Sequence, residues 1–240
     1  MFDYTVVSQN VKDFGRNRLT YVEAKALIKR CMVEEPTALI GLQEMHSVEH
    51  VTALRDACRE TGWKYSFGGI HAQVNGTPIT WNAAHWDKIG SASPLLHRGL
   101  ARVCQKRFIT EVTLRRKSTS QVVRMLNTHF IPGAFKAHRG IRRRYWNIGL
   151  KRLRRRVWAA TQKERIDLIV VTGDMNRAIR RGRLLKPSVG GYKFTMHPSQ
   201  RGNSIDQVYV GSRAPHARGY DVSKKPTASD HERLTVKFRR

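Results

Sequence analysis

The chain has 240 residues, with 45 Lys and Arg against 18 Asp and Glu, which gives a formal net charge of +27 at pH 7. Its length and its 40% hydrophobic content exclude a disordered chain and predict a single domain over residues 1–240. So large an excess of clustered positive charge favours a nucleic-acid partner, DNA before RNA, over an anionic membrane. A basic surface without any partner is the alternative.

The start of the chain and its cysteines bear on its location. The first residues lead directly into a strand-like run, without the basic and apolar segments of a secretory signal. No apolar run approaches the ~18 residues that a membrane span needs. Cys31, Cys58 and Cys104 are widely spaced and form no C-x-x-C pair. We therefore expect an intracellular, cytoplasmic monomer with reduced thiols, in which Cys31 and Cys58 are small core residues.

In chain order, the first quarter alternates between strands and helices. A strand-like run over Tyr4–Val11 comes first, and Tyr21–Glu34 follows with the apolar spacing of an amphipathic helix. Ala38–Leu42 is the second strand, and Val48–Glu60 is a second helix that Gly62 closes. Strand, helix, strand, helix is the opening of an α/β fold.

Short strands dominate the rest of the chain, and the polar turns between the earlier ones predict antiparallel meanders. The expected strands are Lys64–Phe67, Ile79–Trp81, Trp86–Ile89, Phe108–Leu114, Val122–Asn127, Ile205–Val210 and Leu234–Phe238. A long basic helix is expected over about Arg139–Lys163. The Gly-, Pro- and Arg-rich segment Ala178–Arg201 is predicted to be a loop with no more than one helical turn.

The most informative stretch is the apolar run Ile166–Thr172, which predicts a strand buried on both faces. Gly173 ends it, and Asp174 and Asn176 follow two residues apart. Alternate residues of an extended chain point the same way, so the carboxylate and the amide should project together. Such a pair at the edge of a sheet suits a metal ion or a polar substrate, whereas an ordinary Asx turn is the alternative.

Several other predicted strands also end in, or follow, polar residues of a restricted kind. They are Asn10, Glu44, Asn127-Thr128-His129, Asp206 and Asp230-His231. Together they form the pattern N…LQE…NTH…GDxN…SIDQV…SDH, which resembles the endonuclease/exonuclease/phosphatase superfamily over nearly the whole chain. The resemblance implies a four-layer α/β sandwich, with two mixed β-sheets packed face to face and helices on the outside. It also implies an active site at one edge, Mg²⁺ or Mn²⁺, and attack of water on a phosphate ester.

The residue types suit that chemistry. A phosphate ester resists a nucleophile until a hard cation neutralises its oxygens, and Mg²⁺ prefers oxygen ligands while keeping some of its waters. By the resemblance, Glu44 is the principal metal ligand, with Asn10 beside it and Asp230 completing the shell.

The same resemblance implies five catalytic residues. His231 and Asp206 form a pair in which the carboxylate orients the imidazole and raises its pKa. The histidine is then either the base for water or a donor to a phosphoryl oxygen, and both alternatives stay open. Asp174 resembles the other water-activating or leaving-group carboxylate, and Asn176 resembles an amide that binds a phosphate oxygen. His129 resembles a second histidine, a candidate acid for the leaving oxygen.

One departure from the family pattern concerns His129. Deoxyribonuclease-like members pair this second histidine with a carboxylate from a preceding strand, and no Asp or Glu occurs here between Asp87 and Glu111. His129 is therefore expected to lack an orienting partner.

The basic helix combines an apolar stripe with many cations. Trp146, Leu150, Leu153 and Val157 are spaced to face a sheet. The surrounding arginines either form a solvated outer face or bind phosphates that flank the scissile one. The candidate nucleic-acid-binding residues are Arg139, Arg142, Arg143, Arg144, Arg177 and Arg180.

These features predict a divalent-metal-dependent phosphodiesterase and, more narrowly, a nuclease acting on DNA, with an endonuclease as the first choice. A phosphatase for a small anionic ester, such as an inositol phosphate, is the alternative within the same chemistry. A nucleic-acid-binding module with a vestigial site is the alternative outside it. The net charge favours a polymeric substrate, and the intact acidic and histidine set argues against a pure binder.

Overall fold

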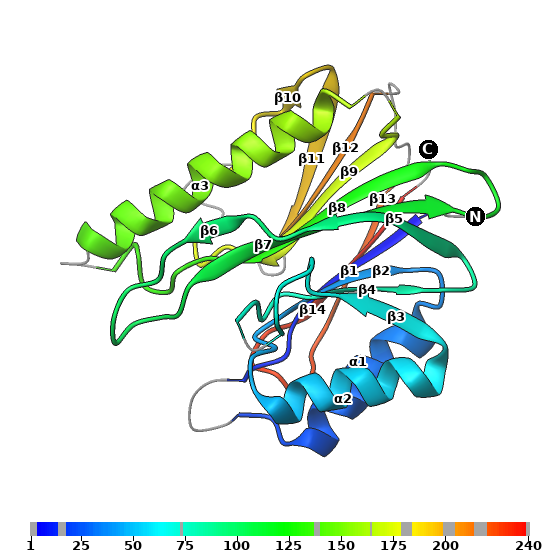
Figure 1. The fold of residues 1–240 in the computed structure, drawn as a ribbon, viewed down its shortest axis with the longest axis horizontal. Helices are drawn as coiled ribbons and strands as arrows, with labels where there is room; N and C mark the ends of the chain where they lie inside the picture. Colours follow the sequence, from blue (N-terminus) through cyan, green and yellow to red (C-terminus); the bar gives the residue numbers. More distant parts are fainter. Residues whose placement is uncertain are drawn as a thin grey trace.

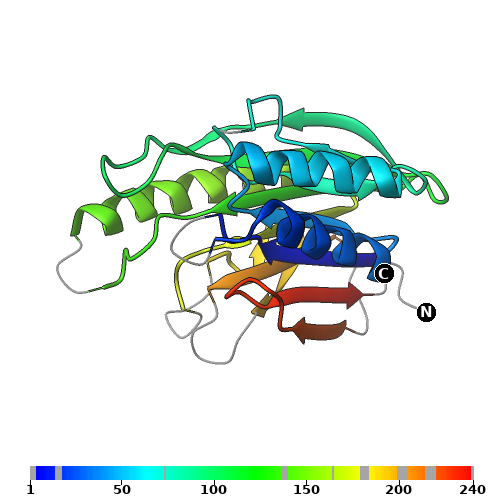
Figure 2. The same cartoon turned by 90° about the horizontal axis from the view of Figure 1, so that it is seen from below.

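The computed structural model describes residues 4–13, 18–72, 74–136, 140–163, 165–178, 184–198, 205–213 and 220–238. Two mixed β-sheets pack face to face and helices cover their outer faces, so the chain forms four layers (Figures 1 and 2). This is the α/β sandwich that the sequence predicts. None of the described helices is both long and apolar enough to cross a membrane.

The six-stranded sheet has the order β13-β14-β1-β2-β4-β3. Its strands are β1 (Tyr4–Asn10), β2 (Leu39–Gln43), β3 (Trp63–Ser66), β4 (Ile79–Asn82), β13 (Tyr220–Lys225) and β14 (Arg233–Phe238). β1 and β2 run parallel, whereas the other described pairs of this sheet are antiparallel. Helices α1 (Tyr21–Glu34) and α2 (Val48–Thr61) cover the outer face of this sheet (Figure 1).

The eight-stranded sheet has the order β10-β11-β12-β9-β8-β7-β5, and β6 pairs with β7 at its side. Its strands are β5 (Trp86–Ala92), β6 (Leu95–His97), β7 (Arg107–Arg116), β8 (Val122–His129), β9 (Leu168–Asp174), β10 (Ser188–Val189), β11 (Tyr192–Pro198) and β12 (Asp206–Ser212). β8 and β9 are parallel neighbours. The single long helix α3 (Gly140–Thr161) lies across the outer face (Figure 1).

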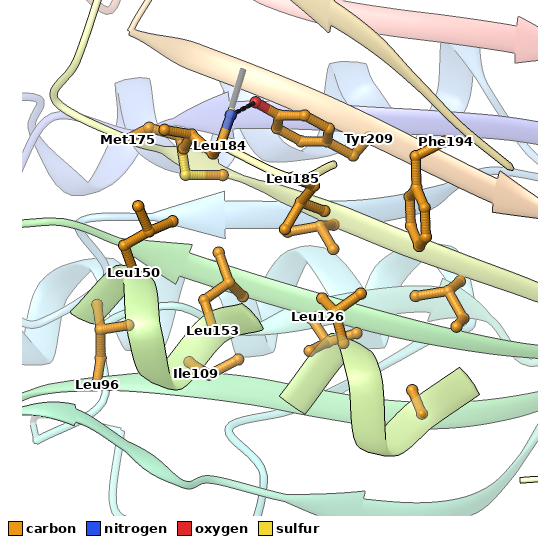
Figure 3. Packing of buried hydrophobic residues seen from close by; sticks show 14 of the residues in the cluster. Leu96, Ile109, Leu126, Leu150, Leu153, Met175, Leu184, Leu185, Phe194 and Tyr209 are labelled. Atoms are coloured by element: carbon orange, nitrogen blue, oxygen red, sulfur yellow. Dashed lines mark hydrogen bonds between the residues drawn. The ribbon is translucent and has the colours of Figure 1, made fainter. Parts of the chain in front are cut away.

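Three apolar clusters hold the layers together, one under each helical layer and one between the sheets. All four residues of the stripe predicted for the basic helix are buried: Trp146, Leu150, Leu153 and Val157. Figure 3 shows Leu150 and Leu153 of α3 over the sheet residues Ile109 and Leu126. Strands β8 and β9 bury side chains on both faces, which explains their continuous apolar sequences.

The helix ends follow local capping rules. Thr20 and Glu23 form a reciprocal capping box at the start of α1. The Ser47 side chain accepts a hydrogen bond from the His50 N–H at the start of α2, and Gly62 closes that helix in the left-handed conformation (φ 72°). As predicted, Cys31 and Cys58 are buried, and all three cysteines are free thiols.

One prediction was wrong. Part of the segment expected to be a loop, Ala178–Arg201, forms the edge hairpin β10–β11. Gly190-Gly191 makes its turn, and Tyr192 and Phe194, two residues apart on β11, both belong to the apolar cluster under α3. Two glycines between alternating residues are a hairpin signal, which the flanking prolines obscured. The short strands β6 and β13 were not predicted either, because each gains its order from pairing with a longer strand.

Candidate active site

The strand topology brings the predicted polar strand ends to one edge of the sandwich. β1 lies parallel to β2, so Asn10 ends beside the turn that carries Glu44. β8 lies parallel to β9 and places His129 beside Asp174, while β12 runs antiparallel along the other side of β9 and places Asp206 beside the same Asp174. Asp174 is therefore central, with a polar strand end on each side.

Gly173 makes this close arrangement possible. Its φ of +154° is unfavourable for a side chain, and a Cβ there would lie 2.2 Å from the Thr128 carbonyl oxygen. Any larger residue would push β8 away from β9 directly before Asp174 and His129. The glycine of the GDxN motif is thus required by backbone packing rather than by chemistry.

Two carboxylates face each other across one amide. Asn10 Nδ2 donates to Glu44 Oε1 at 3.2 Å and to Asp174 Oδ2 at 3.3 Å. The backbone N–H of Asp13 donates to the second oxygen of Glu44 at 3.0 Å, and that of Lys12 donates to Asn10 Oδ1 at 2.9 Å. Glu44 has a left-handed backbone (φ 62°), a strained conformation for a non-glycine residue that its carboxylate contacts help to hold.

Asp174 is a buried carboxylate with an unusual pKa. Burial and the neighbouring charge of Asp206 raise the pKa of Asp174 to about 7, against the charge of His231 and a hydrogen bond from the Asn176 backbone, which lower it. Asn176 Nδ2 donates to the Phe130 carbonyl oxygen at 3.0 Å. The carboxylate and the amide of the GDxN motif thus lie at the same edge, but the contact between the two residues is the Asx turn given as the alternative, in which the Asn176 backbone N–H donates to Asp174 Oδ1 at 2.8 Å.

His231 and Asp206 form the predicted pair. His231 Nδ1 lies 2.7 Å from Asp206 Oδ2. Burial disfavours the charged ring, but the hydrogen bond and the charge of Asp206 outweigh it and raise the pKa of His231 to about 9. The imidazole is therefore positively charged at neutral pH.

His129 has the opposite environment. Its Nε2 lies 3.5 Å from Asp174 Oδ2 and 3.9 Å from Glu44 Oε1, and its Nδ1 is buried without a hydrogen-bond partner among the described residues. Burial, followed by the positive charge of Arg107, holds the pKa of His129 well below its usual value. The ring is therefore neutral at neutral pH, and the described carboxylates within 4 Å of it, those of Asp174 and Glu44, lie on its Nε2 side.

Asp230 lies apart from the two facing carboxylates. Its side chain is 58% exposed and pairs with Lys12 Nζ at 3.1 Å. Its Oδ1 is 3.9 Å from His231 Nε2. The structure thus brings Asp230 to His231 but not to Glu44, because Asp230 lies on the exposed loop before β14 and Lys12 holds its carboxylate.

The donor set fits a divalent cation. Glu44, His129 and Asp174 each offer one ligand atom within 4.8 Å of the others, and Asp174, Asp206 and His231 form a second such group. Buried carboxylates in this proximity repel one another unless a proton or a cation lies between them. Carboxylate oxygens suit Mg²⁺ and Mn²⁺, with Glu44 as the residue that would hold the ion. A bound ion would neutralise the oxygens of a phosphate ester.

Most of these residues line one cavity of about 360 Å³. Its wall consists of Glu44, Val103, Cys104, Gln105, Arg107, His129, Pro132, Asp174, Asn176, Ile205 and His231. Sequence reasoning missed Arg107, which is buried at the start of β7. One arginine in so basic a chain carries no signal of its own.

The arginines predicted to bind nucleic acid differ in how they lie relative to the cavity. Arg139 and Arg180 are outside the described residues. Arg142 donates to the carbonyl oxygen of Pro132, a residue of the cavity wall, at 3.5 Å. Arg143 and Arg144 are exposed on the first turn of α3. The Arg177 guanidinium stacks over the ring of Trp146, 5.1 Å from its centroid, so this arginine packs against α3.

Comparison with known proteins identifies the fold. No family model and no curated protein matches the sequence. Three similar solved structures are mannosyl-6-phosphatase Bt3783 of Bacteroides thetaiotaomicron VPI-5482 (TM-score 0.71, 14% identity, 98% of this chain and 99% of that chain), an endonuclease/exonuclease/phosphatase family protein from Bacteroides thetaiotaomicron (0.71, 14%, 98% and 97%) and D. rerio TDP2 complexed with single strand DNA product (0.70, 13%, 99% and 99%). The chain therefore has the fold of the endonuclease/exonuclease/phosphatase superfamily.

Proposed function

We propose that the protein is a divalent-metal-dependent phosphodiesterase, specifically a nuclease acting on DNA. The observation that carries this proposal is the cavity that Glu44, Asp174, His129 and His231 line together, with His231 charged by its pairing with Asp206. Carboxylates for a hard cation, a carboxyl group that titrates near pH 7 and an imidazolium are the parts that hydrolysis of a phosphate ester requires.

The roles follow from the charge states. Asp174, with its pKa near 7, accepts a proton from the attacking water. His231 is already protonated at neutral pH, so it donates a hydrogen bond to a phosphoryl oxygen rather than acting as the base. Asp206 holds the imidazole through Nδ1, and Glu44 holds the ion. Asn10 donates to both facing carboxylates and so positions them.

Two features support a polymeric substrate. Helix α3 begins near the cavity, carries Arg142, Arg143 and Arg144 on its first turns and has no acidic residue there. The chain as a whole carries a net charge of +27. Both features suit a phosphate backbone that extends beyond the cleaved bond. The similar structure of D. rerio TDP2 with a single strand DNA product agrees with this choice.

A phosphatase for a small anionic ester is the second candidate. One structural neighbour is a mannosyl-6-phosphatase, and a cavity of about 360 Å³ is large enough for a sugar-sized ester. The chemistry in the cavity would be the same.

Purified protein incubated with plasmid DNA, single-stranded RNA and a small phosphomonoester, each with Mg²⁺, with Mn²⁺ and with chelator, separates these candidates. We expect metal-dependent cleavage of DNA that the chelator abolishes. Glu44→Gln should lose most of this activity and keep the fold, and metal titration by calorimetry should show weakened binding. Full turnover by Glu44→Gln with unchanged metal binding would remove Glu44 from the site.

A further inference from the structure

Arg107 is a buried cation without a carboxylate partner. Its side chain comes from the start of β7 and is only 5% exposed, and it lines the same cavity as Glu44, Asp174 and His231. Among the described residues, no carboxylate oxygen lies within 4 Å of its guanidinium, and its Nε has no hydrogen-bond partner. Burial lowers the pKa of this guanidinium, against the Cys104 side chain and the charges of Glu44 and Asp174, which raise it.

The other buried arginines of the described chain are compensated. Arg233 is 1% exposed and pairs with Glu34, and Arg124 is 8% exposed and pairs with Glu111 at 2.6 Å. Burying a charge without a partner is costly, so folded proteins pair such charges or keep them for a ligand. Arg107 is the exception, and it is the one that faces the candidate active site.

The surroundings of Arg107 hold the guanidinium in place without neutralising it. Arg107 Nη1 lies 2.7 Å from His46 Nε2. Because a guanidinium can only donate, His46 Nε2 is the acceptor in this contact. The His46 ring packs so closely on Gly76 that a Cβ there would lie 2.4 Å from it. The His46 backbone N–H donates to Asp13 Oδ2 at 2.9 Å, which holds the backbone of the segment directly after Glu44.

We propose that Arg107 binds the phosphate group that enters this cavity, with its guanidinium donating to the non-bridging oxygens. This inference rests on the proposed function and adds a substrate-binding residue to it. A planar guanidinium matches two phosphate oxygens, whereas a lysine offers only a point charge. Among the described residues that line the cavity, Arg107 is also the only Lys or Arg.

The first test is direct binding of inorganic phosphate, measured by calorimetry in the presence of chelator, so that neither metal nor turnover is needed. Arg107→Met keeps the volume and removes the charge, and it should weaken phosphate binding by about 10- to 100-fold. The phosphate affinity of Arg107→Lys should lie between those of the wild type and Arg107→Met. Arg233→Met is the matched control, because it removes a buried arginine from outside the cavity and should leave phosphate affinity unchanged.

Thermal unfolding separates a binding role from a structural one. Arg233→Met breaks an ion pair and should lower the melting temperature, whereas Arg107→Met removes a buried charge that has no carboxylate partner and should leave the melting temperature unchanged or raise it. With cleaved DNA as the readout, Arg107→Ala should lose kcat/KM and regain part of it when free guanidinium is added. If Arg107→Met fails to fold, Arg107→Lys carries the same comparison.

The outcomes distinguish this inference from the proposed function. Phosphate affinity that is equal in wild type, Arg107→Met and Arg107→Lys would overturn the role of Arg107, even if the wild type cleaves DNA. Phosphate binding that depends on Arg107 in a protein that hydrolyses no ester with Mg²⁺ or Mn²⁺ would support the inference and overturn the proposed function.

Discussion

His231 and His129 line the same cavity but have opposite charge states. His231 is partly exposed on the loop before β14 and is paired with Asp206 at 2.7 Å, which raises its pKa to about 9. His129 is buried at the end of β8, and burial together with Arg107 holds its pKa well below the usual value. One imidazole is a cation before substrate arrives, and the other is neutral.

The comparison shows that neighbouring residues, not residue type, decide what a histidine can do. Asp174 lies close to both rings, at 3.5 Å from His129 Nε2 and within the ligand-atom group that includes His231. A charged His231 can stabilise negative charge on a phosphoryl oxygen. A neutral His129 has no proton to give as a strong acid, so its candidate role as the acid for the leaving oxygen is the weaker assignment.

The largest expected effect is on turnover. His231→Ala should cost at least ~10²-fold more in kcat than His129→Ala, because His231 is the one of these two histidines that brings a charge to the phosphate. Asp206→Asn should reproduce much of the His231→Ala defect, and the double variant should be clearly less than additive. Single-turnover cleavage of one labelled oligonucleotide at saturating Mg²⁺ measures all four variants. Greater damage from His129→Ala would reverse the assignment of the two histidines.

The sequence predicted the His231 half of this comparison better than the His129 half. The pairing of Asp206 with His231 and the convergence of Asn10, Glu44 and Asp174 are what the resemblance of the motif set to the superfamily implies. These contacts join residues far apart in the sequence, so the whole set of motifs predicts them and no single local pattern does.

The neutral state of His129 depends on contacts that no local pattern encodes. Arg107 comes from the start of β7, a strand whose pairing with β8 sets what lies near His129, and His46 comes from a turn of the other sheet. The position of Asp230 likewise depends on Lys12, which is far away in sequence. Long-range packing of side chains decided these features, and a sequence without the fold gives no register for them.

The second prediction is that His231 and His129 make the free energy of unfolding depend on pH in different pH ranges. The pKa of His231 is raised on folding, so its contribution is present below pH 6.5 and is lost as the pH rises through about 9, which corresponds to roughly 3 kcal/mol at most. The pKa of His129 is lowered on folding, so stability is lost as the pH falls below 6.5.

Urea unfolding in chelator, from pH 5 to pH 9.5, measures both effects. Subtracting the curve of His231→Ala from that of the wild type should leave a difference that shrinks towards high pH. The same subtraction with His129→Ala should leave a difference that falls as the pH falls below 6.5. Two differences with the same slope would show that the two rings do not differ in charge state.

The smallest expected effect concerns the arginines of α3, outside the cavity. It separates binding of the nucleic-acid backbone from the part that the two histidines play in turnover. If α3 contacts a nucleic-acid backbone, replacing Arg142, Arg143 and Arg144 with Ala should make log affinity fall less steeply with log salt. The slope should change by about 0.9 for each duplex phosphate that the variant no longer neutralises. Turnover at saturating substrate should stay nearly unchanged. The ratio of the His231→Ala and His129→Ala defects should also be the same in this background, because these arginines on α3 do not set the charge of either ring.

Arg55 and Arg59 supply the matched control for that experiment. They are exposed on α2, on the outer face of the other sheet, and both lie near Asp56. Replacing both with Ala removes positive charge without touching α3, so the salt dependence of DNA affinity should not change. Flattening of the slope in both backgrounds, in proportion to the three and two charges removed, would mean that only total charge matters and that α3 is a solvated face. Flattening confined to the α3 variant would identify that helix as the surface that delivers a phosphate backbone to the cavity where His231 carries its charge.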